Sequence, residues 1–331
     1  MTGKSLRVSW AGTATLIPIL MHTRIPIPMR IAIITVIPIC TPTVKEGEES
    51  RIMIELQQLA KNYGNIQAVA GLDLQITRGE IFGLLGPNGA GKTTTVRMLT
   101  MLTLPSAGRA LINGYEITRD LSKVKKEIGV VPQHMNLDQE LTAWENLELH
   151  GRLHKIPRAK RHRRIEELLE YVELTGRAKD LVSKFSGGMK RRLMIARALM
   201  HYPSVLFLDE PTVGLDPQTR RRIWDLIRKM NGEEMTVLLT THYIEEAEML
   251  CHRVGIMDRG RLIALGTPKE LKQKVGEVVV EILNHGNTGY NFFKNREEAV
   301  QFAGKLEGSV AIRESNLEDV FVELTGRKVG D

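Results

Sequence analysis

Residues 81–93 read IFGLLGPNGAGKT, an apolar run followed by a glycine-rich turn, a lysine and a threonine. The run predicts a buried strand, and KTTTVRMLTML at 92–102 predicts a helix directly after the turn. The pattern G-x-x-x-x-G-K-[ST] between a strand and a helix is typical of a P-loop, whose backbone N–H groups and helix N-terminus bind phosphates. We therefore expect a nucleotide to contact Gly86, Pro87, Asn88, Gly89, Ala90, Gly91, Lys92, Thr93 and Thr94.

A second segment, SVLFLDE at 204–210, supplies the acids that a P-loop requires. Its apolar residues predict a buried strand, and Asp209 and Glu210 stand at the carboxyl end, where open α/β sheets place ligands. We expect Thr93 and Asp209 to hold Mg²⁺ and Lys92 to reach the β- and γ-phosphates. Glu210 is the candidate general base that polarises the attacking water. The alternatives are a glycine-rich turn with an incidental lysine, and two acids in an ordinary surface loop.

Short apolar runs alternate with helical patterns from residue 53 onward, which predicts an α/β sheet. Further strands are predicted at 54–63, 72–77, 128–132 and 236–242, and further helices at 193–200, 221–230 and 244–250. Residues 253–266 predict a hairpin with Arg259 and Gly260 at its turn, and residues 142–175 predict helix throughout. A helical insert at about 138–200 therefore interrupts the alternating core.

The bulk composition excludes few classes of protein. Of the 331 residues, 42% are hydrophobic, which is enough for a packed core. Only 5% are aromatic, which argues against a nucleic-acid surface that stacks bases on aromatic rings. The net charge of +7 is compatible with anionic ligands or membrane surfaces and diagnostic of neither. The two cysteines, Cys40 and Cys251, lie far apart in the sequence, which favours a reducing compartment.

Residues 1–52 differ from the rest because an Ile-Pro pattern recurs within them, at 17–40. Frequent proline disfavours a regular helix or a central strand. Arg24 and Arg30 also interrupt the run of about 20 apolar residues that a transmembrane helix needs. No clean small-residue cleavage site follows, as a signal peptide would require. We interpret residues 1–52 as a disordered or over-extended tail, with Met53 as the functional start; a membrane-associating tail is the alternative, and no span is expected after Met53.

Taken with five further motifs, residues 53–275 resemble the ATP-binding subunits of ABC transporters. The motifs occur in the order of that family and are KNYG at 61–64, VVPQ at 130–133, FSGGM at 185–189, VGLDP at 213–217 and LLTTH at 238–242. The resemblance implies an α/β fold: a P-loop NTPase core with a mainly parallel sheet, an antiparallel β subdomain and an inserted helical subdomain. Residues 276–331 are then a small α/β C-terminal extension.

The resemblance also implies roles for the residues in these motifs. Tyr63 stacks on adenine, Gln133 touches Mg²⁺ and the attacking water, and His242 contacts the γ-phosphate. Two subunits pack head to tail, with Asp216 at their contact. Each ATP then lies between one P-loop and the signature of the other subunit, which is here Ser186, Gly187, Gly188 and Met189.

The signature raises a question of its own, since two adjacent glycines are poor helix formers. We interpret Gly187 and Gly188 as the place where backbone N–H groups approach the phosphate of the partner's ATP, with Gly188 leaving room for the Ser186 hydroxyl. Met189 stands where the family usually has glutamine, and it cannot repeat the hydrogen bonds of that residue.

Two features suggest a branch of the family. FSGGM and NLEDVFVELTG, the latter at 316–326, resemble ATPases that serve drug and polysaccharide exporters, the daunorubicin-resistance type included. A plainer interpretation of 316–326 is a helix that docks on its own domain through an apolar stripe made of Leu317, Val320, Phe321 and Leu324.

The partners implied by the resemblance are ATP, a second ATP-binding subunit (the same chain or a paralogue) and a separate integral-membrane permease. We expect an exporter of drugs, lipids or polysaccharides, with this chain bound peripherally at the cytoplasmic face of the membrane. The cargo is not encoded in these motifs.

Three other functions compete with this one. An importer ATPase subunit is the nearest alternative, followed by a soluble ABC ATPase acting on ribosomes or DNA. Ribosome-acting relatives generally carry tandem nucleotide domains and chromosome-acting ones carry long coiled coils. The chain has neither, so no nucleic-acid partner is expected. A P-loop kinase or GTPase has no use for the signature or for His242.

Two basic segments allow two interpretations each. KIPRAKRHRR at 155–164 either lies near anionic lipid, which is worth about 1 kcal/mol per basic residue, or forms a solvated helix face, which we favour. Lys190, Arg191 and Arg192, directly after the signature, either add to the field at the phosphate or are exposed to solvent.

Overall fold

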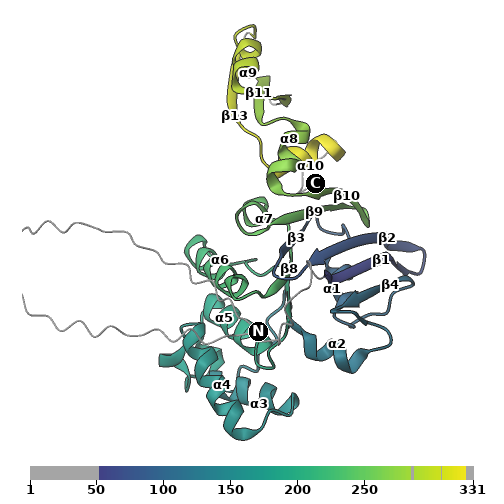
Figure 1. Cartoon of the computed structure of the whole chain (residues 1–331). Coiled ribbons are helices and arrows are strands. Elements are labelled where there is room, and N and C mark those ends of the chain that lie inside the picture. Colours follow the sequence, from purple (N-terminus) through teal and green to yellow (C-terminus); the bar gives the residue numbers. More distant parts are fainter. Residues whose placement is uncertain (1–51, 285–286, 307, 326–331) are drawn as a thin grey trace, which may run out of the picture. The chain divides into compact units, whose positions relative to one another are not determined.

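The computed structural model describes residues 52–284, 287–306 and 308–325, which all belong to one compact unit of the chain (Figure 1). The interpretations of the N-terminal tail concern residues 1–52, and residues 1–51 lie outside the described residues. Ile52 is described and is the first residue of a strand. None of the helices in the described ranges is long and apolar enough to cross a membrane.

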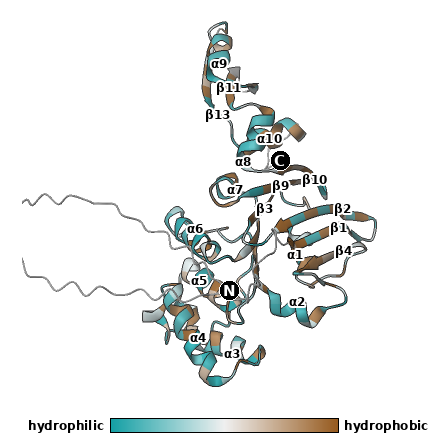
Figure 2. Ribbon diagram, viewed as in Figure 1, coloured by the Kyte–Doolittle hydropathy of each residue, from teal (hydrophilic) through white to brown (hydrophobic). Residues whose placement is uncertain are grey.

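A mainly parallel sheet forms the centre of the fold. Its strand order is β10-β9-β3-β8-β7-β6, and its strands are β3 (Ile81–Leu85), β6 (Ile128–Val131), β7 (Val205–Asp209), β8 (Thr236–Thr241), β9 (Arg253–Asp258) and β10 (Arg261–Gly266). Neighbours pair in parallel except β9 and β10. Every residue of β3 and β7 is buried, because both faces of the sheet are covered. This explains why both strands are apolar up to Asp209, the last residue of β7; β3 can be followed in Figure 2.

The β9–β10 hairpin confirms the predicted turn. Arg259 and Gly260 have φ values of 46° and 76°. Positive φ at both central residues is what the right-handed twist of two-residue hairpins favours, and glycine adopts it at little cost.

An antiparallel sheet packs against the central one. Its order is β2-β1-β4-β5, and its strands are β1 (Ile52–Tyr63), β2 (Ile66–Thr77), β4 (Ala107–Ile112) and β5 (Tyr115–Glu116). From Leu72 to Ile76, buried and exposed side chains alternate along β2, as expected for a sheet with one covered face. Leu72 and Ile76 belong to the same apolar cluster as Phe82 and Leu84 of β3. Two helices also contribute to this cluster, α1 (Lys92–Leu99) and α2 (Leu121–Glu127).

A helical part lies between β6 and β7 in the sequence. It contains α3 (Ala143–Leu153), α4 (Arg158–Tyr171), two 3-10 turns, η1 (Thr175–Arg177) and η2 (Val182–Lys184), and α5 (Gly187–Ala198). A capping box between Thr142 and Glu145 begins α3. The prediction of helix throughout 142–175 is wrong after Tyr171, where α4 ends, and between α3 and α4. There Lys155 has a φ of 57°, and Pro157 disfavours helical backbone in the residue before it.

The helical part is tied to the central sheet by one large apolar cluster. Leu193 of α5 and Leu206 of β7 belong to it, as does Ile227 of the next helix. That helix and its successor are α6 (Pro217–Gly232) and α7 (Ile244–Leu250). The α/β fold class expected from the sequence is therefore confirmed, with its parallel sheet, antiparallel sheet and helical insertion.

The chain beyond β10 forms a small antiparallel sheet of order β12-β11-β13 with three helices. These elements are α8 (Pro268–Val275), β11 (Val278–Asn284), β12 (Asn287–Phe293), α9 (Arg296–Ala303), β13 (Ser309–Glu314) and α10 (Leu317–Thr325). In α10, Leu317, Val320 and Phe321 are buried in the large apolar cluster, which confirms that this helix docks on its own chain. Leu324 is 48% exposed and takes no part.

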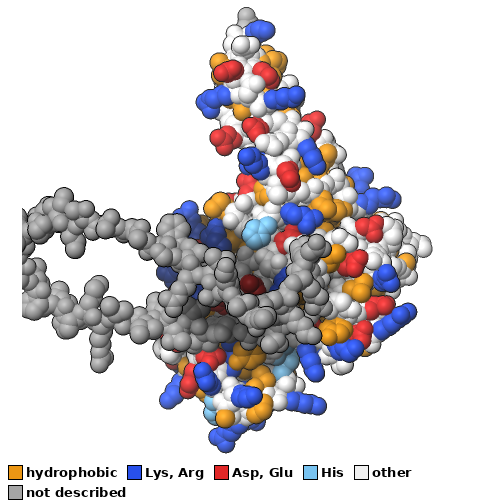
Figure 3. All heavy atoms as spheres, viewed as in Figure 1, with side chains coloured by type: hydrophobic (Ala, Val, Ile, Leu, Met, Phe, Trp, Pro, Cys, Tyr) orange, Lys and Arg blue, Asp and Glu red, His pale blue; other side chains and the backbone are white. Residues whose placement is uncertain are grey.

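The basic segment 155–164 is not wholly a solvated face. Arg161 and Arg164 are buried, and this part of the expectation is wrong. Arg161 donates to Glu148 at 2.6 Å, and Arg164 donates to the carbonyl oxygen of Leu199 at 2.9 Å. Elsewhere, basic and acidic side chains are interspersed over the face that Figure 3 shows.

Candidate active site

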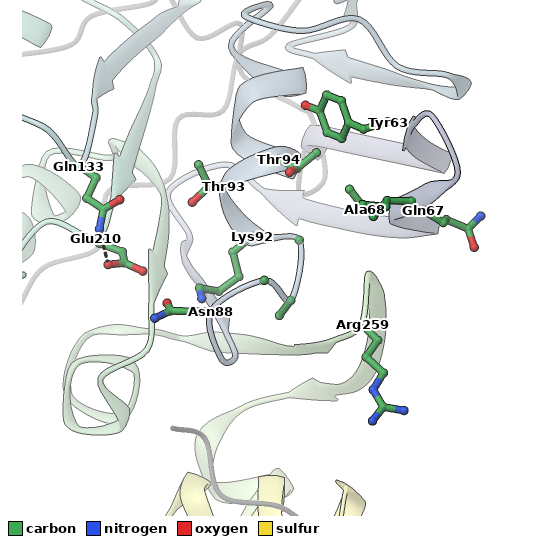
Figure 4. Close-up of a pocket in the computed structure, with 14 residues that line it drawn as sticks. Tyr63, Gln67, Ala68, Asn88, Lys92, Thr93, Thr94, Gln133, Glu210 and Arg259 are labelled. Atoms are coloured by element: carbon green, nitrogen blue, oxygen red, sulfur yellow. Dashed lines mark hydrogen bonds between the residues drawn. The ribbon is translucent and has the colours of Figure 1, made fainter. Parts of the chain in front are cut away.

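The glycine-rich loop after β3 leads into α1 and opens onto a cavity of about 410 Å³ (Figure 4). Gly91 precedes α1 with a φ of 102°. A Cβ on Gly91 would lie 2.5 Å from the carbonyl oxygen of Ala68, so both backbone conformation and space require glycine there. Of the predicted loop residues, those that line the cavity are Asn88, Gly89, Ala90, Gly91, Lys92, Thr93 and Thr94.

Gly86 and Pro87 contribute to the loop through their carbonyl oxygens. The Nζ of Lys92 donates to both, at 2.7 and 3.0 Å, and the lysine is only 4% exposed. Burial lowers the pKa of Lys92, while the charges of Glu210 and Asp209 act in the opposite direction. An anion that enters the cavity would therefore compensate a positive charge that has been removed from water.

Thr93 and Asp209 meet at the carboxyl edge of the sheet. The hydroxyl of Thr93 donates to Asp209 Oδ1 at 3.2 Å, and the hydroxyl of Thr240 on β8 donates to the same oxygen at 2.5 Å. Hydroxyl and carboxylate oxygens are the ligands that Mg²⁺ prefers, so this pair fits that ion. The sequence analysis missed Thr240, because its role depends on β8 lying beside β7.

Glu210 has a left-handed backbone conformation, with a φ of 47°. Its N–H donates to both the carbonyl oxygen and the hydroxyl of Thr240, each at 3.1 Å, and these bonds hold the strained residue. The carboxylate accepts a hydrogen bond of 2.9 Å from Nε2 of Gln133 and lies 3.3 Å from Nδ1 of His242. Because Gln133, Glu210 and His242 closely follow the adjacent strands β6, β7 and β8, the parallel sheet brings together residues that are remote in sequence.

The opposite end of the cavity is formed by the β1–β2 hairpin. Figure 4 shows Tyr63 and Arg259 at this end and Gln133 and Glu210 at the other, with Lys92 between them. Tyr63 is 45% exposed, and the Nζ of Lys61 lies over its ring at 5.1 Å from the centroid, so a ligand could reach the exposed part of the ring. The sequence analysis missed four lining residues, which are Ile66, Gln67, Ala68 and Arg259.

The β9–β10 turn joins this hairpin to the phosphate loop. Gly260 donates its N–H to the carbonyl oxygen of Ala90 at 3.0 Å, and its own carbonyl accepts from the N–H of Ala70 at 2.8 Å. The doublet Arg259-Gly260 was recognisable in the sequence as a turn, but no sequence pattern indicated that this turn bridges the two walls.

The signature residues lie apart from the lining of this cavity. Ser186 is the N-cap of α5 and accepts a hydrogen bond of 3.3 Å from the N–H of Met189. A Cβ on Gly188 would lie 2.3 Å from Cγ2 of Thr219 on α6, whereas one on Gly187 would make only an ordinary contact. Gly188 is therefore required by packing within the chain, against Thr219 rather than beside Ser186 as the sequence analysis expected.

Asp216 occupies a similar position on the next helix. It is the N-cap of α6, and its carboxylate accepts a hydrogen bond of 2.9 Å from the N–H of Thr219. Thr219 thus contacts Gly188 of the signature and is held by Asp216, so the two motifs are neighbours in the fold.

Comparison with known proteins is consistent with this arrangement. A family model described as ABC transporter matches residues 69–213. A daunorubicin resistance ATP-binding protein, DrrA3 of Streptomyces coeruleorubidus, is 42% identical over 80% of this chain and 93% of its own length. A Nod factor export ATP-binding protein I of Cupriavidus pinatubonensis is 41% identical over 84% of this chain and 92% of its own. The chain belongs to the ABC transporter ATP-binding proteins.

A solved structure agrees with this assignment. A dimeric ATP-binding cassette in a post-hydrolysis state, bound to ADP and Pi, is 31% identical to this chain, with a TM-score of 0.59. The match covers 65% of this chain and 98% of the other. The protein is therefore an ATPase, and the resemblance to daunorubicin-resistance type ATPases is confirmed at the level of sequence.

A further arginine of this ABC ATPase was misjudged from its sequence. Arg191 is 1% exposed, so the interpretation that it is exposed to solvent is wrong. Its Nη1 and Nη2 donate to the carbonyl oxygens of Pro132 and Gln133, at 2.8 and 3.0 Å. The helix that carries the signature thus holds the backbone of the glutamine that contacts Glu210.

Proposed function

We propose that this chain hydrolyses Mg²⁺-ATP in the cavity described above and thereby powers export through a separate membrane permease. The observation that carries the proposal is the arrangement around the P-loop cavity: Lys92, Gln133 and Glu210 line it, while Asp209 contacts Thr93 and His242 contacts Glu210 directly beside it. Separately, each of these residue types is common on protein surfaces. Together, at the carboxyl edge of a parallel sheet, they supply the parts of a phosphoryl-transfer site.

In this proposal the P-loop binds the phosphates through its backbone N–H groups and Lys92. Glu210 accepts the proton of the attacking water, and the backbone bonds to Thr240 fix its position. In this structure, Gln133 and His242 both contact the Glu210 carboxylate. Once ATP is bound, Gln133 would turn toward the attacking water and His242 toward the γ-phosphate. Tyr63 provides a surface on which adenine stacks.

Thr93 and Asp209 are the residues that would hold Mg²⁺, with Gln133 as a further oxygen ligand. When bound, the ion would supply positive charge beside the β- and γ-phosphate oxygens. The hydrogen bond from Thr240 would keep the Asp209 carboxylate turned toward the ion.

A second ATP-binding subunit, either the same chain or a paralogue, would complete the site. In the proposed head-to-tail dimer, Ser186, Gly187, Gly188 and Met189 contact the ATP of the partner, and Asp216 lies near the subunit contact. Two observations support this: the signature stands apart from its own cavity, and a relative of similar structure is a dimer in a post-hydrolysis state.

We further propose the division of the chain made from the sequence. Residues 53–275 form the ATP-binding domain, with the helical insert at about 138–200 facing the permease, and residues 276–331 form an extension. The chain would sit peripherally on the cytoplasmic side of the membrane. The names of the relatives, which refer to daunorubicin resistance and Nod factor export, favour export over import.

The decisive experiment has two parts. The full chain, with a C-terminal tag, is captured from detergent-solubilised membranes, and we expect an integral-membrane protein to accompany it in constant ratio. Capture of ribosomes or DNA alone would refute the transporter function. Transport is then measured in inside-out and right-side-out vesicles with daunorubicin and a Nod factor as probes. ATP-dependent uptake into inside-out vesicles supports export, and uptake only into right-side-out vesicles would identify an importer.

A further inference from the structure

Three histidines of the helical part lie together, away from the residues that line the ATP cavity. His150 is on α3, His154 caps the C-terminus of the same helix one turn later, and His201 follows α5. One ring nitrogen of each lies within 4.8 Å of those of the other two. The rings of His154 and His201 stack with centroids 3.9 Å apart, and those of His150 and His154 are 4.8 Å apart. The helices α3 and α5 contact each other in this part of the fold.

The hydrogen bonding of His201 identifies the nitrogen that is free to bind a ligand. Its Nε2 lies 2.9 Å from the carbonyl oxygen of Ile128, at the start of β6. Because a carbonyl oxygen can only accept, Nε2 must carry the hydrogen, and Nδ1 then carries a lone pair. That Nδ1 is buried and has no hydrogen-bond partner among the described residues. A histidine whose second ring nitrogen donates to a backbone carbonyl is the usual arrangement of a metal ligand.

The surroundings disfavour the protonated form of all three rings. Burial lowers the pKa of His150 to about 3 and that of His201 to about 4, and it also lowers the pKa of His154. The charge of protonated His154 acts in the same direction on both His150 and His201, and Arg197 and Arg164 add smaller effects on His150 and His201, respectively. Neutral imidazole is the form that binds metal ions, so no proton has to be displaced near pH 7.

The two arginines are the charges that would oppose a bound cation, and both have other partners. Arg164 donates to the carbonyl oxygen of Leu199 and lies 3.5 Å from a carboxylate oxygen of Glu167. Arg197 donates to the carbonyl oxygen of Asn136 at 2.7 Å. Their guanidinium groups are therefore directed to these acceptors.

We propose that His150, His154 and His201 form a binding site for one divalent transition-metal ion, with Zn²⁺ as the best match. Three imidazole nitrogens suit zinc, copper or nickel rather than Mg²⁺, which prefers oxygen. Zinc binds histidine at about 2.0–2.1 Å, which places tetrahedral ligand atoms about 3.3 Å apart. The three nitrogens, now up to 4.8 Å apart, would have to close by rotation of half-buried rings. The fourth position would be left to water.

An ion at this site would connect three elements of the fold. It would join α3 to the end of α5 and, through the His201–Ile128 hydrogen bond, to the first residue of β6. The other end of β6 leads to Gln133, so occupancy would stiffen the support of the glutamine that contacts Glu210. This inference does not depend on the transport function.

The test uses the full chain without a histidine tag, freed of metal by a chelator and kept free of nucleotide, because ATP itself binds zinc. Titration with Co²⁺ reports tetrahedral nitrogen ligation through visible absorption, and calorimetry with Zn²⁺ gives the affinity and stoichiometry. We expect one ion per chain and a rise in the melting temperature. The variant His154→Ala should weaken Zn²⁺ binding at least about tenfold, since even second-shell changes cost about 10–100-fold.

A matched control is His162→Ala, which removes a histidine of the same helical part that lies outside the cluster. It should leave the affinity for Zn²⁺ unchanged. The double variant with His150→Phe and His154→Ala keeps the His201–Ile128 hydrogen bond and should lose the ion if the site is real. Circular dichroism establishes that both variants are folded. Absence of binding by the wild-type chain, or undiminished binding by the folded double variant, would overturn the proposal.

Discussion

Arg191 and Gln133 are joined by a hydrogen bond of 3.0 Å from the Nη2 of the arginine to the backbone carbonyl of the glutamine. A second bond, to Pro132, makes the contact two-pronged. The guanidinium is buried, and burial lowers its pKa despite the opposing charges of Glu246 and Asp209. The Arg191 side chain therefore links the signature helix α5 to the loop after β6 through two hydrogen bonds.

The variant Arg191→Gln tests whether this link positions Gln133. It leaves buried carbonyl oxygens without donors, so we expect a loss of about 1–3 kcal/mol in the free energy of unfolding. Turnover should fall while the affinity for ATP stays near the wild-type value, because the P-loop is untouched. Arg192→Gln is the control: Arg192 bonds to the carbonyl of Val172 instead, so that variant should lose stability without a specific loss of turnover. Equal turnover in the two variants would contradict a positioning role for Arg191.

Glu210→Gln should abolish ATP hydrolysis and preserve binding. Removal of a general base lowers turnover by about 10²–10⁴-fold, while the amide still accepts a hydrogen bond at the same place. Phosphate release measures the first effect, and nucleotide binding with size-exclusion chromatography measures a trapped, ATP-dependent dimer. The exposed Glu234→Gln is the control, with wild-type turnover expected. Sustained hydrolysis by the Glu210→Gln variant would refute the role of Glu210 as the general base.

Gly188→Ala separates packing from ligand contact in the signature. The added Cβ would collide with Thr219, for which we expect a loss of about 1–3 kcal/mol in unfolding free energy even without nucleotide. Gly187→Ala meets no such contact and should unfold nearly as the wild type does. Adding Thr219→Ser to Gly188→Ala removes the colliding methyl group and should restore stability. If chemical denaturation shows no loss for Gly188→Ala, the packing explanation is incorrect.

The ion pair between Glu148 and Arg161 predicts a pH dependence of stability. The Arg161 hydrogen bonds lower the pKa of Glu148 from 4.5 to about 2. A carboxyl group with a depressed pKa in the folded state stabilises fully above about pH 4.5, and this contribution is lost as pH falls toward 2. Urea unfolding at pH 6 should therefore show Glu148→Gln to be less stable than the wild type, and the difference should shrink at pH 3. A difference that is independent of pH would exclude the ion pair as its cause.

The parts of the site that lie within one motif were predictable, and the contacts between motifs were not. The P-loop could be recognised because its spacing is local and its flanking strand and helix have clear patterns. The acids Asp209 and Glu210 followed from their place at a strand end. By contrast, Thr240, Ala68 and Arg259 acquire their roles only from strand order and hairpin packing, which no local pattern specifies.

Burial of charge was the other source of error. Arg161, Arg164 and Arg191 stand in basic runs that look solvated in sequence, yet each is buried and donates to a backbone carbonyl. An arginine can be buried when its fork of donors meets fixed acceptors, and those acceptors come from distant residues. The break between α3 and α4 could have been predicted from the sequence, because Pro157 disfavours helical backbone in the residue before it.

The hydrogen bonds of Gly260 have a consequence for binding. The turn that carries this glycine is bonded on one side to the phosphate loop and on the other to the strand that follows Tyr63. The hairpin end of the nucleotide cavity and the phosphate loop are therefore already joined before any ligand arrives. Less conformational entropy remains to be lost when ATP enters, so more of its contact energy is available for drawing two subunits together.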